Sequence, residues 1–149
     1  MRWINGAFPI LMAAALSMLL PSTANAQAVL SNGGNSDGAI SVAGENDTWT
    51  FAANTGDSIV LRIGQLSDAT GNFEPQIRLL SPANAQLGSS VGDLAAEIAV
   101  TAPSSGTYTV VVSDGNLGHS GDSLGNTGTY RLHLAKVPGP FVVDRKSVV

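Results

Sequence analysis

Cysteine and positive charge are the two things this 149-residue sequence most plainly lacks. The absence of cysteine excludes disulfide bonds, zinc–thiolate sites and thiol nucleophiles. Between residues 27 and 143 there are four basic residues against ten acidic ones, a net charge of −6. The chain therefore lacks the basic surface that binds phosphate backbones and anionic membranes. We expect neither nucleic acid nor a membrane surface as a partner.

Residues 1–26 have the pattern of an export signal. Arg2 supplies the positive start, and residues 10–20 form an apolar run shorter than the roughly 20 residues that a membrane-spanning helix needs. Ala24-Asn25-Ala26 is a small-x-small site, which predicts cleavage before Gln27. The short run disfavours the alternative, an uncleaved anchor. We expect a product without a membrane span, placed in the medium, at the cell surface or in the periplasm.

Apolar and polar residues alternate with period two along residues 39–137, and no window has helical spacing. Gly, Pro, Asn and Asp mark the gaps. The pattern predicts strands at 39–42, 48–52, 58–64, 76–80, 86–90, 96–101, 107–113 and 129–135. About eight strands in such a length predict an all-β fold, an antiparallel β-sandwich with jelly-roll-like connections. The polar, glycine-rich residues 27–38 are expected to be a flexible linker.

The alternation also predicts which side chains form the core. The inward-facing set is Trp49, Phe51, Ile59, Leu61, Ile63, Ile77, Leu79, Ile98, Val100, Tyr108, Val110, Val112, Tyr130, Leu132 and Leu134. Exposed aromatic residues can also form a sugar-binding platform. The alternation of inward and outward positions, however, assigns Trp49, Tyr108 and Tyr130 to the core. Asn54-Thr55-Gly56-Asp57 has the length and composition of a hairpin turn.

Five ordered segments carry a family resemblance. They are Asp47–Phe51, Gly56–Ile63, Pro75–Leu79, Ala102–Val112 and Gly128–Leu132. In order and spacing they resemble the bacterial pre-peptidase C-terminal domain over about residues 40–136, within a predicted unit of 39–137. The resemblance implies a small β-sandwich attached to exported proteins, with an accessory role in secretion or in holding an enzyme near a polymer. Some members of that family bind calcium or a fibrous or glycan ligand.

Catalytic residues are not expected. A hydrolase triad needs a base, and the two histidines are His119, in a glycine-rich loop, and His133, on the outer face of a predicted strand. No serine stands in the strand–turn–helix context that a Gly-x-Ser-x-Gly nucleophile requires. Glu45 and Asp47 are close enough in sequence to suggest a glycosidase pair, but acids at a strand entrance are usually solvated. We therefore predict a protein that is not an enzyme.

Calcium is the one cofactor for which the sequence offers candidate ligands. Residues 114–126 join the last two predicted strands and supply Asp114, Asn116 and Asp122, oxygen ligands of the type that a hard cation prefers. The spacing does not fit an EF-hand, and an ion-free polar hairpin loop is the alternative. Asn32, Asn35 and Asp37 form a second, weaker set.

Residues 138–149 are predicted to be a tail. Residues 144–149 put three charges in a row in a chain that is 12% charged. This hexapeptide is also the translation of part of a common sequencing adapter, so an artefact and a genuine polar tail are both open. If residues 144–149 are an artefact, the natural protein continues beyond Val143.

We expect the chain to be the N-terminal accessory or adhesion module of a longer exported protein. We expect it to be monomeric, with an extracellular polymer or a cell-surface protein as its partner. The alternative is a calcium-dependent module that binds glycan or protein polymers.

Overall fold

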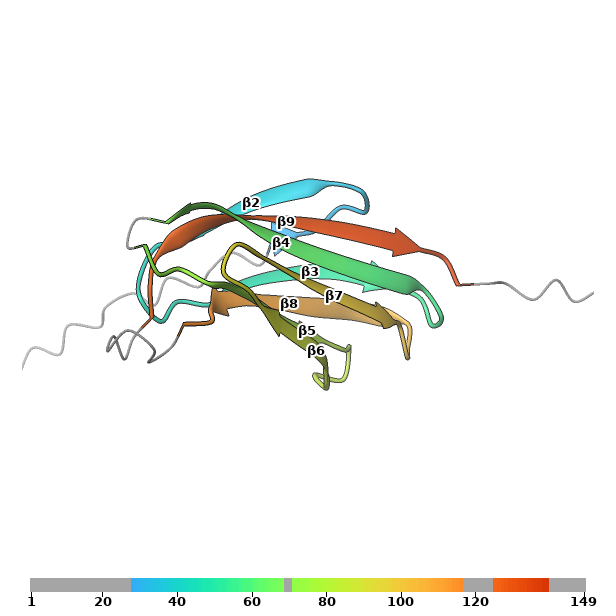
Figure 1. Cartoon of the computed structure of the whole chain (residues 1–149). Helices are drawn as coiled ribbons and strands as arrows, with labels where there is room; N and C mark the ends of the chain where they lie inside the picture. The colour runs from blue at the N-terminus through green and yellow to red at the C-terminus, as the bar shows by residue number, and fades with distance from the viewer. Residues whose placement is uncertain (1–27, 69–70, 117–124, 140–149) are drawn as a thin grey trace, which may run out of the picture.

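Two facing β-sheets make up the part of the chain that the structure describes, residues 28–68, 71–116 and 125–139 (Figure 1). In this computed structural model one sheet has the strand order β1-β3-β8-β5-β6 and the other β2-β9-β4-β7. The strands are β1 (Ala28–Val29), β2 (Asn35–Ile40), β3 (Asp47–Ala53), β4 (Ser58–Asp68), β5 (Pro75–Leu80), β6 (Gln86–Val91), β7 (Ala95–Thr101), β8 (Gly106–Asp114) and β9 (Gly128–Val137). The predicted all-β sandwich is confirmed. Within the three ranges no helix is long and apolar enough to cross a membrane.

The period-two pattern places the core as predicted. In β4, Ile59, Leu61 and Ile63 are at most 1% exposed, whereas Arg62 between them faces solvent. Burying each such side chain stabilises the fold by about 1.5–3 kcal/mol. Phe51 and Tyr108 stack with ring centroids 5.5 Å apart. Two residues of the predicted inward set, Trp49 and Val100, are only partly buried and pack against the edge of the core.

The most regular strands, β8 and β9, lie in different sheets. β8 pairs with β3 and β5, and β9 pairs with β2 and β4, so each is central in its own sheet. Their buried side chains therefore line opposite walls of one core. The connection between β8 and β9 therefore joins the two sheets, so the alternative reading of residues 114–126 as a hairpin loop is wrong in its topology.

The turn at residues 54–57 is also a crossover and not a hairpin. β3 and β4, which it joins, belong to different sheets. The Asp57 N–H donates to the Asn54 carbonyl at 3.0 Å, and Gly56 has a φ of 88°, a conformation that favours glycine. Turn composition predicted the reversal of direction but not the change of sheet.

The predicted linker over 27–38 is wrong where the structure describes it. Asn35 to Ile40 form the edge strand β2 on β9, and Ala28 and Val29 pair with Trp49 and Thr50 as the short parallel strand β1. Edge strands pair through backbone groups and tolerate polar side chains. The polar composition of this segment was therefore compatible with strand structure.

Candidate functional site

Asp114, the first of the predicted calcium ligands, ends β8 with 3% of its surface exposed. Its carboxylate accepts hydrogen bonds from the backbone N–H groups of Glu74 (2.9 Å), Asn116 (3.3 Å) and Asn126 (2.7 Å). The Asn126 side-chain amide adds a fourth bond at 3.0 Å. Asp114 therefore ties together three segments that are distant in sequence. Burial of this carboxylate is offset by the four donors that surround it.

Asn116, the second predicted ligand, lies beside Asp114 and is 6% exposed. Its side-chain amide donates to the Asn72 carbonyl at 3.1 Å. Its Oδ1 atom is buried and has no hydrogen-bond partner in the part of the chain that the structure describes. A buried oxygen without a donor is unusual, and a bound cation or water would satisfy it.

The structure brings together only two members of the predicted calcium set. Asp114 and Asn116 are in contact, and Asp122 lies outside the described residues. Across 28–68, 71–116 and 125–139, no group of three His, Asp or Glu side chains is arranged to hold a metal.

The weaker calcium set is divided among other contacts. Asn32 exchanges two hydrogen bonds with the backbone of Lys136, and the Asp37 carboxylate is held by Arg131 at 2.6 and 2.8 Å. The Arg131 guanidinium holds the pKa of Asp37 below its usual range. These contacts account for the positions of the Asn32 and Asp37 side chains without a bound ion.

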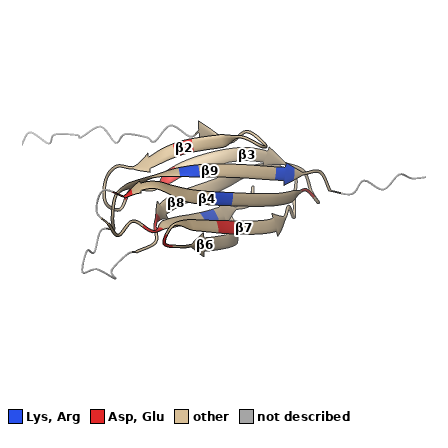
Figure 2. Ribbon diagram, turned by 45° about the horizontal axis from the view of Figure 1, so that its top comes forward, with Lys and Arg blue, Asp and Glu red and all other residues tan. Residues whose placement is uncertain are grey.

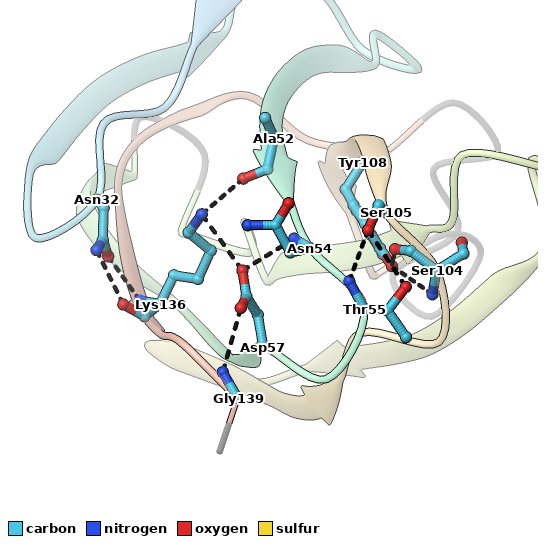
Figure 3. Close-up of polar contacts among 10 residues, drawn as sticks. All are labelled: Asn32, Ala52, Asn54, Thr55, Asp57, Ser104, Ser105, Tyr108, Lys136 and Gly139. Carbon is cyan, nitrogen blue, oxygen red and sulfur yellow. Dashed lines mark hydrogen bonds and ion pairs between the residues drawn. The ribbon is translucent and has the colours of Figure 1, made fainter. Parts of the chain in front are cut away.

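At the opposite end of the sandwich, Asp57 is the centre of a polar cluster that sequence reasoning missed (Figure 3). Its carboxylate accepts from the backbone N–H of Asn54 at 2.9 Å and of Gly139 at 3.2 Å. Lys136 Nζ lies 3.5 Å from Asp57 Oδ2 and donates to the Ala52 carbonyl at 3.0 Å. Chiefly through the Asn54 N–H, this environment lowers the pKa of Asp57.

A second missed network connects the two sheets through Tyr130. The Tyr130 hydroxyl donates to Asp47 Oδ2 at 2.5 Å and accepts from the indole N–H of Trp49 at 2.9 Å. Burial raises the pKa of Tyr130 well above its usual range and raises that of Asp47. The Trp49 indole N–H is thus engaged in an internal hydrogen bond, which favours its assignment to the edge of the core over a sugar platform.

Three candidates for acid–base chemistry remain, and the structure describes two of them. Glu45 accepts from the backbone N–H groups of Ser41 and Val42, at 2.6 and 3.0 Å. His133 lies half-buried on the outer face of β9, opposite Arg62 of β4, as the alternation predicted. His119 lies outside the described residues.

Part of this chain matches a known protein family. Residues 45–114 match the family described as the bacterial pre-peptidase C-terminal domain, which confirms the resemblance read from the sequence. No curated protein sequence matches this chain. The matched range ends at Asp114, whereas β9, beyond it, lies at the centre of one sheet.

Two solved structures share the fold. A crystal structure of Aeromonas hydrophila PliG, a periplasmic lysozyme inhibitor of g-type lysozyme, has a TM-score of 0.57 at 16% identity, covering 74% of this chain and 96% of that one. The pre-peptidase C-terminal domain of a collagenase from Bacillus anthracis has a TM-score of 0.54 at 15% identity, covering 72% and 93%. At such identities the similarity is one of fold.

Proposed function

We propose, from the premise that residues 45–114 carry a bacterial pre-peptidase C-terminal domain, that this chain is a non-catalytic accessory or adhesion module of an exported protein. The observation that supports this proposal most is the hydrogen bonding of the buried carboxylates. Asp57 and Asp114, the most buried acids of the described residues, are both occupied by intramolecular N–H donors. Groups held in this way stabilise a scaffold, and binding would then use the outer surface.

Export is part of the proposal. It is supported by the signal pattern of residues 1–26 and by the occurrence of the matched domain in secreted proteins. Expression of the full chain in a bacterium, followed by fractionation and N-terminal sequencing, tests it. We expect a periplasmic or extracellular product that begins at Gln27, and a cytoplasmic product with an intact N-terminus would contradict export.

Adhesion is tested by co-sedimentation. The exported protein would be mixed with insoluble peptidoglycan, cellulose, chitin and collagen, and the depleted fraction and any soluble degradation products would be measured. Retention on one polymer without release of fragments is the expected result. Release of fragments from any of them would contradict the non-catalytic role.

Calcium-dependent binding of a glycan or protein polymer is the second candidate. Asn116 Oδ1 next to Asp114 favours it, because this oxygen has no partner within the described part of the chain. The residues present fit a hard cation in chemistry, since they offer amide and carboxylate oxygens. A cation that binds only the folded state raises its stability by mass action, by about 2.7 kcal/mol at a concentration 100 times Kd. We expect a higher Tm in Ca²⁺ than in EDTA, lost in Asp122→Asn. An unchanged Tm would contradict this candidate.

A further inference from the structure

Gly64 lies in the interior of a central strand, a position where glycine is uncommon. It lies in β4, which pairs on both sides, with Arg131 of β9 and Ala95 of β7 as its neighbours. A Cβ atom added there would have no heavy atom within 4 Å, and its φ is not in the left-handed region. Neither packing nor backbone conformation therefore requires glycine. Glycine in a strand interior weakens the strand and often marks a β-bulge, a tight bend or the close approach of a ligand. The bulge in β4 lies between Gln65 and Ser67, whereas Gly64 itself is in regular register with both neighbouring strands.

Gly64 lines an open hollow of about 520 Å³ on the outer face of the β2-β9-β4-β7 sheet, together with residues from all four strands. Such a volume is in the range of small-molecule sites. Its lining includes the apolar residues Ile63, Gly64, Leu66, Ala95 and Ala96. Leu66 is 50% exposed, a large apolar side chain left facing solvent beside the hollow.

Cations are concentrated at this hollow. The described residues contain four Lys and Arg side chains, and Arg62 and Arg131 both line it. Figure 2 shows the basic positions on β4 and β9, with an acidic position on the neighbouring β7. His133 lies opposite Arg62 on β9 and completes the same side of the rim. In a domain with a net charge of −6 between residues 27 and 143, this placement is not expected from composition.

The ion pairs at the rim leave donors unused. Arg62 contacts Glu97 through Nε, with the two side chains 59% and 48% exposed. Within the described residues its two Nη groups have no hydrogen-bond partner. Exposed pairs of this kind are weak, so the guanidinium is available to another anion. The paired Nη groups match the two oxygens of a carboxylate.

We propose that this hollow is a binding site for a small carboxylate with an apolar body. The body lies over Gly64, Ala95 and Leu66, and the carboxylate accepts from the Nη groups of Arg62. The site differs in place and chemistry from the Asp114 end, and it requires no metal. Its failure or success is therefore independent of the calcium test above.

The test uses the exported protein and two probes in an NMR titration of backbone amide shifts. The probes are 3-phenylpropionate and 3-phenylpropan-1-ol, which have the same ring and chain length. We expect saturable shifts at Gly64, Ala95 and Arg131 with 3-phenylpropionate at a Kd of about 1–5 mM, the strength that a ligand of this size reaches in an open site. The alcohol is expected to bind at least about tenfold more weakly, because it lacks the charged group that accepts hydrogen bonds from Arg62. Equal binding of both probes, or no shifts around Gly64, would overturn the proposal.

Two variants and a matched control locate the site. Gly64→Val places a bulkier, strand-favouring side chain in the hollow and is expected to weaken binding of the carboxylate at least about tenfold while the protein stays folded. Ala99→Val adds bulk to an exposed residue of the same sheet outside the hollow and should leave binding unchanged. Arg62→Gln should weaken the carboxylate but not the alcohol. If Gly64→Val does not fold, Gly64→Ala takes its place.

Self-association gives the competing outcome. A dimer in sedimentation equilibrium that dissociates in Gly64→Val would assign the hollow to a second copy of this chain and overturn the small-ligand assignment. Unchanged binding in both Gly64→Val and Arg62→Gln would do so as well. A monomer that loses the carboxylate in these two variants alone supports it.

Discussion

Asp57 and Asp114 lie at opposite ends of the sandwich, each 3% exposed, yet the two ends hold their carboxylates differently. Asp57 has a nearby cation, Lys136 at 3.5 Å, together with two backbone N–H donors. Asp114 has four N–H donors and, among the described residues, no ion pair. A carboxylate can thus be accommodated by N–H dipoles without a cation, provided that enough of them converge.

The difference bears on function as well as on stability. The Asp57 cluster joins the β3–β4 turn to the segment after β9 and leaves its lysine bonded to a backbone carbonyl. The Asp114 end includes Asn116, whose Oδ1 has no hydrogen-bond partner among the described residues. No buried side-chain oxygen described at the Asp57 end is left in this state, so the Asp114 end is the better candidate for a cation.

The largest effect is expected from removal of the Asp114 carboxylate. Asp114→Ala leaves four N–H donors without their acceptor, and each unsatisfied buried group is costly, so we expect a loss of about 3 kcal/mol in the free energy of unfolding. Urea denaturation at pH 7 measures it. Asp114→Asn, which keeps one oxygen, should lose about half as much, on the same reasoning. A loss below about 1 kcal/mol for the alanine variant would show that water replaces the carboxylate easily.

A smaller loss is expected from a methyl group at Gly38, in the network of Asp47 at the same end. A Cβ there would lie 2.4 Å from Tyr130, which is fully buried and cannot move aside. Gly38→Ala should cost about 2 kcal/mol through overpacking and lose the Tyr130–Asp47 bond. Gly64→Ala is the control, because the same methyl group meets no atom within 4 Å there. Equal thermal stability of the two variants would contradict the expectation.

Acid titration separates Asp57 from the other end. Its pKa is lowered in the folded state, so its contribution is present above the ordinary value of about 3.9 and is lost as the pH falls through the folded value. Asp57→Asn should unfold at a lower temperature than the parent protein near pH 6, and the difference should shrink below about pH 4. A difference that stays constant down to the lowest pH would show that the hydrogen bonds, and not the charge, carry the effect.

The smallest effect, of opposite sign, is expected at Asp47. Burial raises its pKa, so the folded state retains a proton that the unfolded state has lost, and stability falls as the pH rises from about 3.9 through the folded value. Asp47→Asn removes that fall and should change stability at pH 7 by less than about 1 kcal/mol, since Asn Oδ1 still accepts from Tyr130. Thermal unfolding between pH 3 and 7, about the range in which carboxylates titrate, measures it. A parent protein and variant with the same pH profile would contradict the raised pKa.

Local alternation determined most of the core and most strand positions. Side chains in a strand alternate between faces whatever the strand pairs with, so Leu61, Val110 and Leu132 were assigned to the interior correctly from the sequence alone. The same logic failed for the polar edge strand β2, which is held by backbone hydrogen bonds to β9 and needs no apolar pattern.

What only the tertiary structure decided is where distant segments meet. Asp57 and Lys136 are 79 positions apart, and Gly38 meets Tyr130 only because β2 pairs with β9. The hollow at Gly64 is lined by four strands from different parts of the chain. Periodicity is a property of neighbouring residues and can be read from the sequence. The partner of a buried carboxylate, or the space above a glycine, depends on strand order and register, which no short stretch of sequence contains.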